Sequence, residues 1–141
     1  MSKIIGIDYG KRRTGIAISD PNGDIAFPRE TISCNKQKEV IQRISKLCHD
    51  EEIETIVIGL PCNMKGEDTP QTTTTREFAE RLGARLKNAR IELLDERLST
   101  IQAERSLIEK GIRKFSEIDE IAAQIILQAW LDRDKLLKTR S

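Results

Sequence analysis

The sequence has few of the residues that carry histidine, thiol or zinc chemistry. Its only histidine, His49, falls near the end of an expected helix, where the helix dipole explains it better than catalysis does. One histidine argues against a histidine-based acid–base or Ser/His/Asp mechanism. The three cysteines form no CxxC pair, which argues against a zinc site and favours reduced thiols; they are Cys34, Cys48 and Cys62.

Long apolar runs and a strong excess of charge of one sign are also missing. No run approaches the length of a membrane span, and the N-terminal residues do not form the apolar segment of a signal peptide. Charged residues make up 33% of the chain, yet the net charge is only +1. Nucleic-acid binding would therefore depend on a local basic patch. We expect one cytoplasmic domain spanning residues 1–141.

Short apolar runs, rich in isoleucine, predict the strands. Two of them, within residues 3–20, flank a glycine-rich basic turn and are expected to form an antiparallel hairpin. A third strand at residues 25–32 contains Pro28, which favours a sheet edge. The β-branched run 55–61 predicts a buried parallel strand, and residues 91–94 a short fifth strand.

Two helices are expected between these strands. Asn35 is predicted to cap the first, and the spacing of its apolar residues predicts one face packed on the sheet; these are Val40, Ile41, Ile44, Leu47 and Cys48. Thr69-Pro70 begins the second helix, because proline suits the first turn. The threonine run 72–75 forms helices weakly, so we expect it to be an exposed helix start.

Two further helices follow the fifth strand. A capping box at Ser99 predicts the start of the third helix, which is expected to stop at Gly111. A second cap signature at Ser116 predicts the last helix, whose charged end is expected to fray from residue 132. The element order predicts an α/β fold with a mixed five-stranded sheet, in which a three-strand antiparallel meander joins parallel strands flanked by helices.

Acidic residues are expected to meet at one edge of this sheet. Asp8 ends the first strand, Asp95-Glu96 ends the fifth, and Asp119 opens the last helix. Side-chain alternation does not decide which of the two adjacent acids points into the site. Asp119 is explained equally well by helix capping, and Asp95 by pairing with Arg97. Asp8 is the hardest to dismiss, because an isolated buried charge is costly.

Three carboxylates at one point repel one another unless a divalent cation neutralises them. Oxygen ligands of this kind suit Mg²⁺ or Mn²⁺. Two ions about 4 Å apart would activate a water and stabilise the leaving oxygen of a phosphodiester displacement. Lys11, Arg12 and Arg13 would ordinarily be a solvated turn, but beside the acids they are candidates for gripping phosphate. The loop 63–67 is ordinarily a connection, yet it leaves the same sheet edge.

Four segments together resemble the signatures of one bacterial family. This is the YqgF, or RuvX-like, family of pre-16S rRNA nucleases and Holliday junction resolvases, which has a ribonuclease H-like fold. The resemblance runs from about residue 3 to residue 131. The segments, in order, are 6–10 with 12–17, 58–61 with Asn63, Met64 and Gly66, 94–100, and Asp119 with Ala122-Ala123 and 126–128.

The resemblance implies a cytoplasmic nuclease that trims the 5′ end of the 16S rRNA precursor. It implies that Asp8, Glu96 and Asp119 are the catalytic, metal-binding acids. Candidates for substrate binding are Lys11, Arg12, Arg13, Asn63, Lys65 and Arg97. The sequence departs from the family in two places: residues 114–117 are less basic than usual, and Thr69 stands where glycine is common.

Three alternatives remain open. A resolvase acting on four-way DNA junctions would need a two-fold dimer; the sequence has no clear dimer helix, so we expect a monomer or weak dimer. The turn after Asp8 also resembles the first phosphate loop of actin-like ATPases, which need two such domains. A non-catalytic RNA-binding factor for ribosome assembly would function without Asp8.

Overall fold

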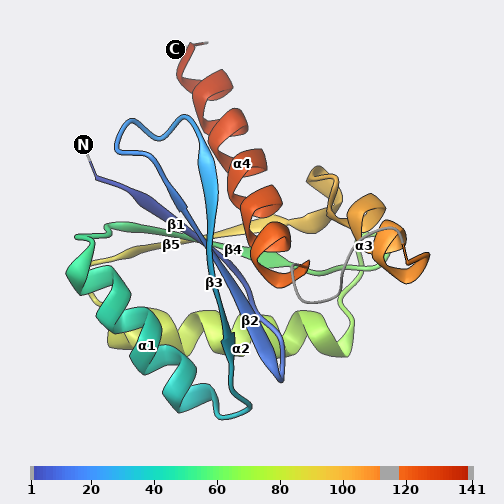
Figure 1. The fold of residues 1–141 in the computed structure, drawn as a ribbon, viewed down its shortest axis with the longest axis horizontal. Coiled ribbons are helices and arrows are strands. Elements are labelled where there is room, and N and C mark those ends of the chain that lie inside the picture. The colour runs from blue at the N-terminus through green and yellow to red at the C-terminus, as the bar shows by residue number, and fades with distance from the viewer. Residues whose placement is uncertain (1, 112–117, 140–141) are drawn as a thin grey trace.

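A computed structural model describes residues 2–111 and 118–139, which build one mixed sheet with helices on both faces (Figure 1). The strands are β1 (Ile4–Asp8), β2 (Arg13–Ser19), β3 (Ala26–Ser33), β4 (Thr55–Leu60) and β5 (Arg90–Asp95). The helices are α1 (Gln37–Asp50), α2 (Pro70–Arg85), α3 (Ile101–Glu109) and α4 (Ile118–Thr139), with a short 3₁₀ turn η1 (Glu96–Leu98) after β5.

The five strands lie in the order β3-β2-β1-β4-β5. The first three form an antiparallel meander, and β1, β4 and β5 run parallel. This confirms the predicted sheet. Pro28 lies on the edge strand β3, as expected for a residue without an amide hydrogen.

Two apolar layers cover the sheet. On one face, α1 and α2 pack against isoleucines of β1, β2 and β4, with Phe78 and Leu82 fully buried. On the other face, α4 packs on Ala17 and Val57 through a layer that includes Ala123 and Leu127. Figure 1 shows α1 and α2 on one side of the strands and α4 on the other. Among the described residues, no helix is long and apolar enough to cross a bilayer.

The predicted start of α1 is wrong in detail. Lys36, not Asn35, precedes the first turn, and no side chain caps the helix. The sulfur of Cys34 accepts a weak hydrogen bond from the Lys36 amide instead. The predicted buried face is confirmed, with Val40, Ile44 and their neighbours against the sheet.

The predicted exposure of the threonine run at the start of α2 is only partly right, since Thr73 is exposed. Thr69 caps the helix, and Pro70 follows it as expected. Thr72 and Thr75, however, are buried. Thr72 completes a capping box with Thr69, and its hydroxyl donates to the carbonyl of Pro61. Thr72 therefore ties the helix start to the end of β4, and this contact offsets its poor helix propensity.

The last two helices differ from expectation at their ends. The capping box at Ser99 does not form, and Thr100, which precedes α3, provides no side-chain cap; the Ser99 hydroxyl donates to the Glu96 carbonyl and accepts from the Ile101 amide. Gly111 follows the end of α3 with a φ of +76°, as a helix-ending glycine should. The expected cap at Ser116 lies outside the described residues. α4 is helical to Thr139, so it extends past residue 132, from which fraying is expected.

Gly83 offers a stabilising substitution within α2. A Cβ added there would meet Ile91 Cγ1 at 3.5 Å, an ordinary van der Waals contact. We expect Gly83→Ala to raise the free energy of unfolding by about 0.5–1 kcal/mol, because alanine loses less backbone entropy in a helix. Urea denaturation of the two proteins measures the difference. A destabilised variant would mean that β5 lies closer to α2 than the structure shows.

Candidate active site

A pocket of about 280 Å³ opens at the carboxyl end of β1. Crossing from one parallel strand to the next brings the carboxyl ends of β1, β4 and β5 to this edge. The pocket is lined by Asp8, Tyr9, Gly10, Arg13, Pro61, Gln71, Glu96, Arg105, Ile118 and Asp119. The three acids expected to meet here do line one pocket.

Asp8 stands at the centre of this edge. It is the last residue of β1, with β2 on one side and β4 on the other, and its side chain is only 16% exposed. The next residue, Tyr9, is held by two contacts. Its ring stacks on Phe78, with centroids 4.0 Å apart, and its carbonyl accepts a hydrogen bond from Gln71. Packing of the neighbouring turn therefore fixes the position of Asp8.

The two acids after β5 take different places. Glu96 begins the 3₁₀ turn η1, is 3% exposed and lines the pocket. Asp95 lies outside the pocket, where both of its carboxylate oxygens bind the Arg97 guanidinium. The tight turn rather than strand alternation decides which acid faces Asp8.

Asp119 reaches the pocket from α4, on the face of the sheet toward which the Gly15 partner of Asp8 is turned. It lies in the first turn of α4, and its Oδ2 is 3.1 Å from Nε of Arg13. The first turn can come this close because Gly15 of β2 has no side chain: a Cβ there would lie 1.8 Å from the Asp119 carbonyl oxygen.

One arginine links the other two acids. Nη2 of Arg105, on α3, is 3.2 Å from Oδ1 of Asp8 and 3.2 Å from Oε1 of Glu96. The sequence around the acids did not predict a role for Arg105, because Arg105 lies far from Asp8 along the chain. A signal existed in hindsight: Arg105 lies one turn after the buried Ile101, on the same side of α3.

The surroundings of the pocket disfavour the ionised forms of Asp8 and Asp119. Burial raises the pKa of the Asp8 carboxyl to about 7; the Arg105 charge opposes this rise, and the Glu96 and Asp119 charges add to it. Burial also raises the pKa of Asp119, against the effect of Arg13 and Arg105. By contrast, the hydrogen bond from Arg97 lowers the pKa of Asp95 outside the pocket. With three acids and two arginines, the pocket therefore carries a net negative charge when all five groups are ionised.

The donor set suits a hard divalent cation. The acids of the pocket offer carboxylate oxygens, which Mg²⁺ and Mn²⁺ prefer, and a guanidinium already occupies the place between two of them. Within residues 2–111 and 118–139, no three His, Cys, Asp or Glu side chains are gathered closely enough to hold one ion together. Ion binding would thus require the side chains to shift from their contacts with the arginines.

The predicted basic turn is only partly in the pocket. Arg13 lines it, whereas Lys11 and Arg12 are exposed in the turn before it.

The predicted loop residues lie beside the pocket rather than in it. The Asn63 side-chain oxygen accepts hydrogen bonds from the amides of Lys65 and Glu67, which closes the loop into a tight turn. Gly66, with a φ of +81°, lies against the Arg97 guanidinium, where a Cβ would come within 2.8 Å of its nitrogens. Asn63 and Arg97 therefore shape the loop, and Lys65 is exposed on it.

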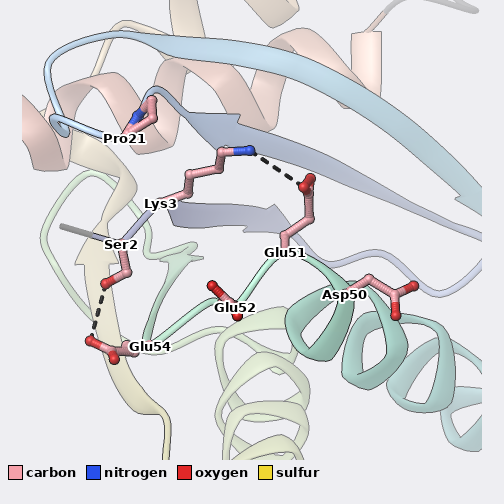
Figure 2. A pocket seen from close by; sticks show the side chains of 7 residues that line it. All are labelled: Ser2, Lys3, Pro21, Asp50, Glu51, Glu52 and Glu54. Atoms are coloured by element: carbon pink, nitrogen blue, oxygen red, sulfur yellow. Dashed lines mark hydrogen bonds and ion pairs between the residues drawn. The ribbon is translucent and has the colours of Figure 1, made fainter.

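A larger hollow of about 610 Å³ lies at the other end of the sheet. Figure 2 shows its acidic side chains, among which Glu51 binds Lys3 and Glu54 accepts a hydrogen bond from Ser2. Glu51 also pairs with Arg29. Glu51 is neutralised by two cations and the other acids of this hollow are exposed, which argues against chemistry there.

The sheet order, with α4 across its face, defines a chain of ribonuclease H-like fold. Solved structures with this arrangement include Thermus thermophilus RuvC in complex with Holliday junction substrate, at a TM-score of 0.61 and 14% identity over 96% of both chains. The yeast mitochondrial Holliday junction resolvase Ydc2 has a TM-score of 0.59 and 14% identity, covering 98% of this chain and 81% of that one. At this identity the likeness concerns the fold.

The particular family follows from the sequence. A family model described as RuvX, Holliday junction resolvase, matches residues 2–133, and the chain belongs to that family. A relative from Acetivibrio thermocellus is 42% identical over 134 residues, covering 92% of this chain and 95% of its own. That relative is named "Putative pre-16S rRNA nuclease".

Proposed function

We propose that this chain is a metal-dependent nuclease that cleaves phosphodiester bonds at the 5′ end of the 16S rRNA precursor, in the cytoplasm. The observation that carries the proposal is the meeting of Asp8, Glu96 and Asp119 in one pocket at the carboxyl edge of the sheet. These acids come from three separate parts of the chain. Burying them together is costly for stability, and a catalytic use explains why the fold accepts that cost.

The three acids would hold two Mg²⁺ or Mn²⁺ ions. When bound, such ions neutralise charge that develops on the phosphodiester and make water a stronger nucleophile. The protein's own residues fix the carboxylates: packing of Tyr9 fixes Asp8, the η1 turn fixes Glu96, and the first turn of α4 fixes Asp119.

Cations around the pocket would bind the nucleic-acid backbone. Arg13 lines the pocket, and the exposed Lys11 and Arg12 come just before it in the chain, where they would add positive charge. Lys65 would add a phosphate contact from the neighbouring loop. Asn63 and Arg97 would act indirectly, by holding that loop in shape. The RNA substrate rests on the names of close relatives such as the Acetivibrio thermocellus protein.

The second candidate is a resolvase of four-way DNA junctions. The likeness of the fold to RuvC bound to a Holliday junction favours it, as does the description of the family model. Symmetric cutting of a junction would need two active sites related by a two-fold axis. A monomer or weak dimer fits RNA trimming better.

The test offers purified protein three labelled substrates with Mg²⁺ or Mn²⁺. These are a single-stranded RNA, an RNA with a 5′ extension that mimics the precursor, and a four-way DNA junction. We expect cleavage of the extended RNA, and we expect EDTA to abolish it because the carboxylates cannot act without an ion. Excess Mg²⁺ should restore the activity.

The other outcomes separate the alternatives. Symmetric cutting of the junction, with little cutting of either RNA, would favour the resolvase. Tight RNA binding by folded protein, with no metal-dependent cleavage of any substrate, would favour a non-catalytic assembly factor.

A further inference from the structure

Arg105 contacts both Asp8 and Glu96 through hydrogen bonds. A single nitrogen, Nη2, makes both contacts, each 3.2 Å long. Arg97 behaves differently: it faces one carboxylate with two nitrogens, in the paired geometry that arginine favours. The Arg105 contact is therefore a bridge between two acids that are candidate metal ligands.

The two carboxylates need this bridge when no ion is present. Asp8 and Glu96 are both largely buried, with side chains 16% and 3% exposed. Two such groups side by side repel each other strongly, because little water screens them. The other arginine of the pocket, Arg13, pairs with Asp119. Arg105 is thus the cation placed between Asp8 and Glu96.

The Arg105 side chain is placed so that it can move away from Asp8 and Glu96. Its side chain is 38% exposed, so the guanidinium can turn toward solvent. Of the residues of α3, only Ile101 is buried, so the helix does not hold Arg105 in a packed core. The contact is thus replaceable, whereas β1 and η1 hold the backbone of the two acids in place.

We infer that Arg105 is an internal counter-cation, which holds Asp8 and Glu96 together in the metal-free protein and competes with the divalent ion for them. The inference rests on the proposed function, because it requires these acids to bind metal. Arg105 is on this view a positioning residue. Its removal should strengthen metal binding, whereas loss of a purely structural residue would weaken it.

The test measures Mn²⁺ affinity at pH 8 from the free-ion signal in electron paramagnetic resonance, with no substrate present. We expect Arg105→Gln to bind Mn²⁺ about tenfold tighter than wild type, because a competing positive charge is gone. Arg105→Lys should fall between the two. Arg43→Gln is the matched control: it removes the same charge at an exposed pair with Glu30, and it should bind as wild type does.

Thermal melting supplies a second readout. In EDTA, Arg105→Gln should melt roughly 3–6 °C below wild type, because the two acids lose their shared partner. Saturating Mn²⁺ should remove most of that difference. If Arg105→Gln does not fold, the affinity of Arg105→Lys decides, since an unchanged or weaker affinity there contradicts the inference.

Two negative results have different meanings. Unchanged or weaker Mn²⁺ binding by folded Arg105→Gln, with binding lost in Asp8→Asn, would overturn this inference alone. Equal Mn²⁺ binding by wild type and Asp8→Asn would overturn the proposed metal site and this inference with it.

Discussion

Asp8→Asn protein is expected to lose metal-dependent cleavage by roughly 10³-fold or more while remaining folded. The amide keeps the shape of the side chain but cannot supply a negatively charged ligand. Asp8 has no substitute at its position, because Glu96 and Asp119 reach the pocket from other elements. Initial cleavage rates on the extended RNA, at saturating Mg²⁺, measure the loss.

The same variant should gain stability at alkaline pH in metal-free buffer. Because burial raises the pKa of Asp8 in the folded protein from 3.8 to about 7, ionisation of this group favours the unfolded chain. The loss of unfolding free energy caused by this ionisation is absent below about pH 4, grows as the pH rises to 7, and is complete above that. The amide of the Asp8→Asn variant does not ionise, so this protein should exceed wild type by on the order of 2–4 kcal/mol at pH 8 and match it near pH 4. Urea denaturation in EDTA at the two pH values measures the difference.

Asp50→Asn provides the matched control. It removes the same charge from an exposed residue at the end of α1, where Asp50 pairs with Lys46. Cleavage by Asp50→Asn should stay within about twofold of wild type, because the residue is remote from the pocket. Full activity in Asp8→Asn would contradict the catalytic role of Asp8 and favour a non-catalytic RNA-binding assembly factor.

The sheet could be predicted from the sequence because each strand carries its own local signal. Apolar runs bounded by glycine or proline gave the strands, and Pro28 marked the edge. The position of Asp8 followed from the same signal, since a strand that ends in an acid delivers that acid to the sheet edge.

The rest of the site depends on contacts that a local pattern does not contain. Neither alternation nor spacing could choose between Asp95 and Glu96, because a 3₁₀ turn replaces the strand at that point. The family resemblance named Glu96, and the structure places that side chain in the pocket. Arg105 escaped notice because its partner Asp8 is 97 residues away.

The errors at the helix starts have a related cause. Thr72 and Thr75 look like exposed positions by propensity, yet both are buried, and Thr72 lies against the end of β4. A hydroxyl can satisfy a backbone carbonyl such as that of Pro61 and so be favoured at a buried helix start. Propensity alone could not show which partner was available.

Gly15→Ala is expected to cost about 3 kcal/mol or more of unfolding free energy and to disable the site. The added Cβ would lie 1.8 Å from the Asp119 carbonyl oxygen and 2.3 Å from its carbonyl carbon. These are backbone atoms, so no rotamer change can relieve the overlap. The first turn of α4 must move away from β2, and Asp119 would move with it.

Gly59→Ala is the matched comparison, since it is the same change on another strand of the sheet. Its Cβ would meet Ile126 Cδ1 at 2.4 Å, the far end of a buried side chain that must change rotamer, and Glu96 Cγ only at 3.4 Å, an ordinary van der Waals contact, so we expect a loss of only about 1–2 kcal/mol. Urea denaturation gives the stabilities, and cleavage at a temperature where each variant is folded gives the activities. Folded Gly15→Ala should remain inactive when folded Gly59→Ala is active, because only the former displaces a carboxylate. Wild-type stability and activity in Gly15→Ala would show that Asp119 approaches the sheet from elsewhere.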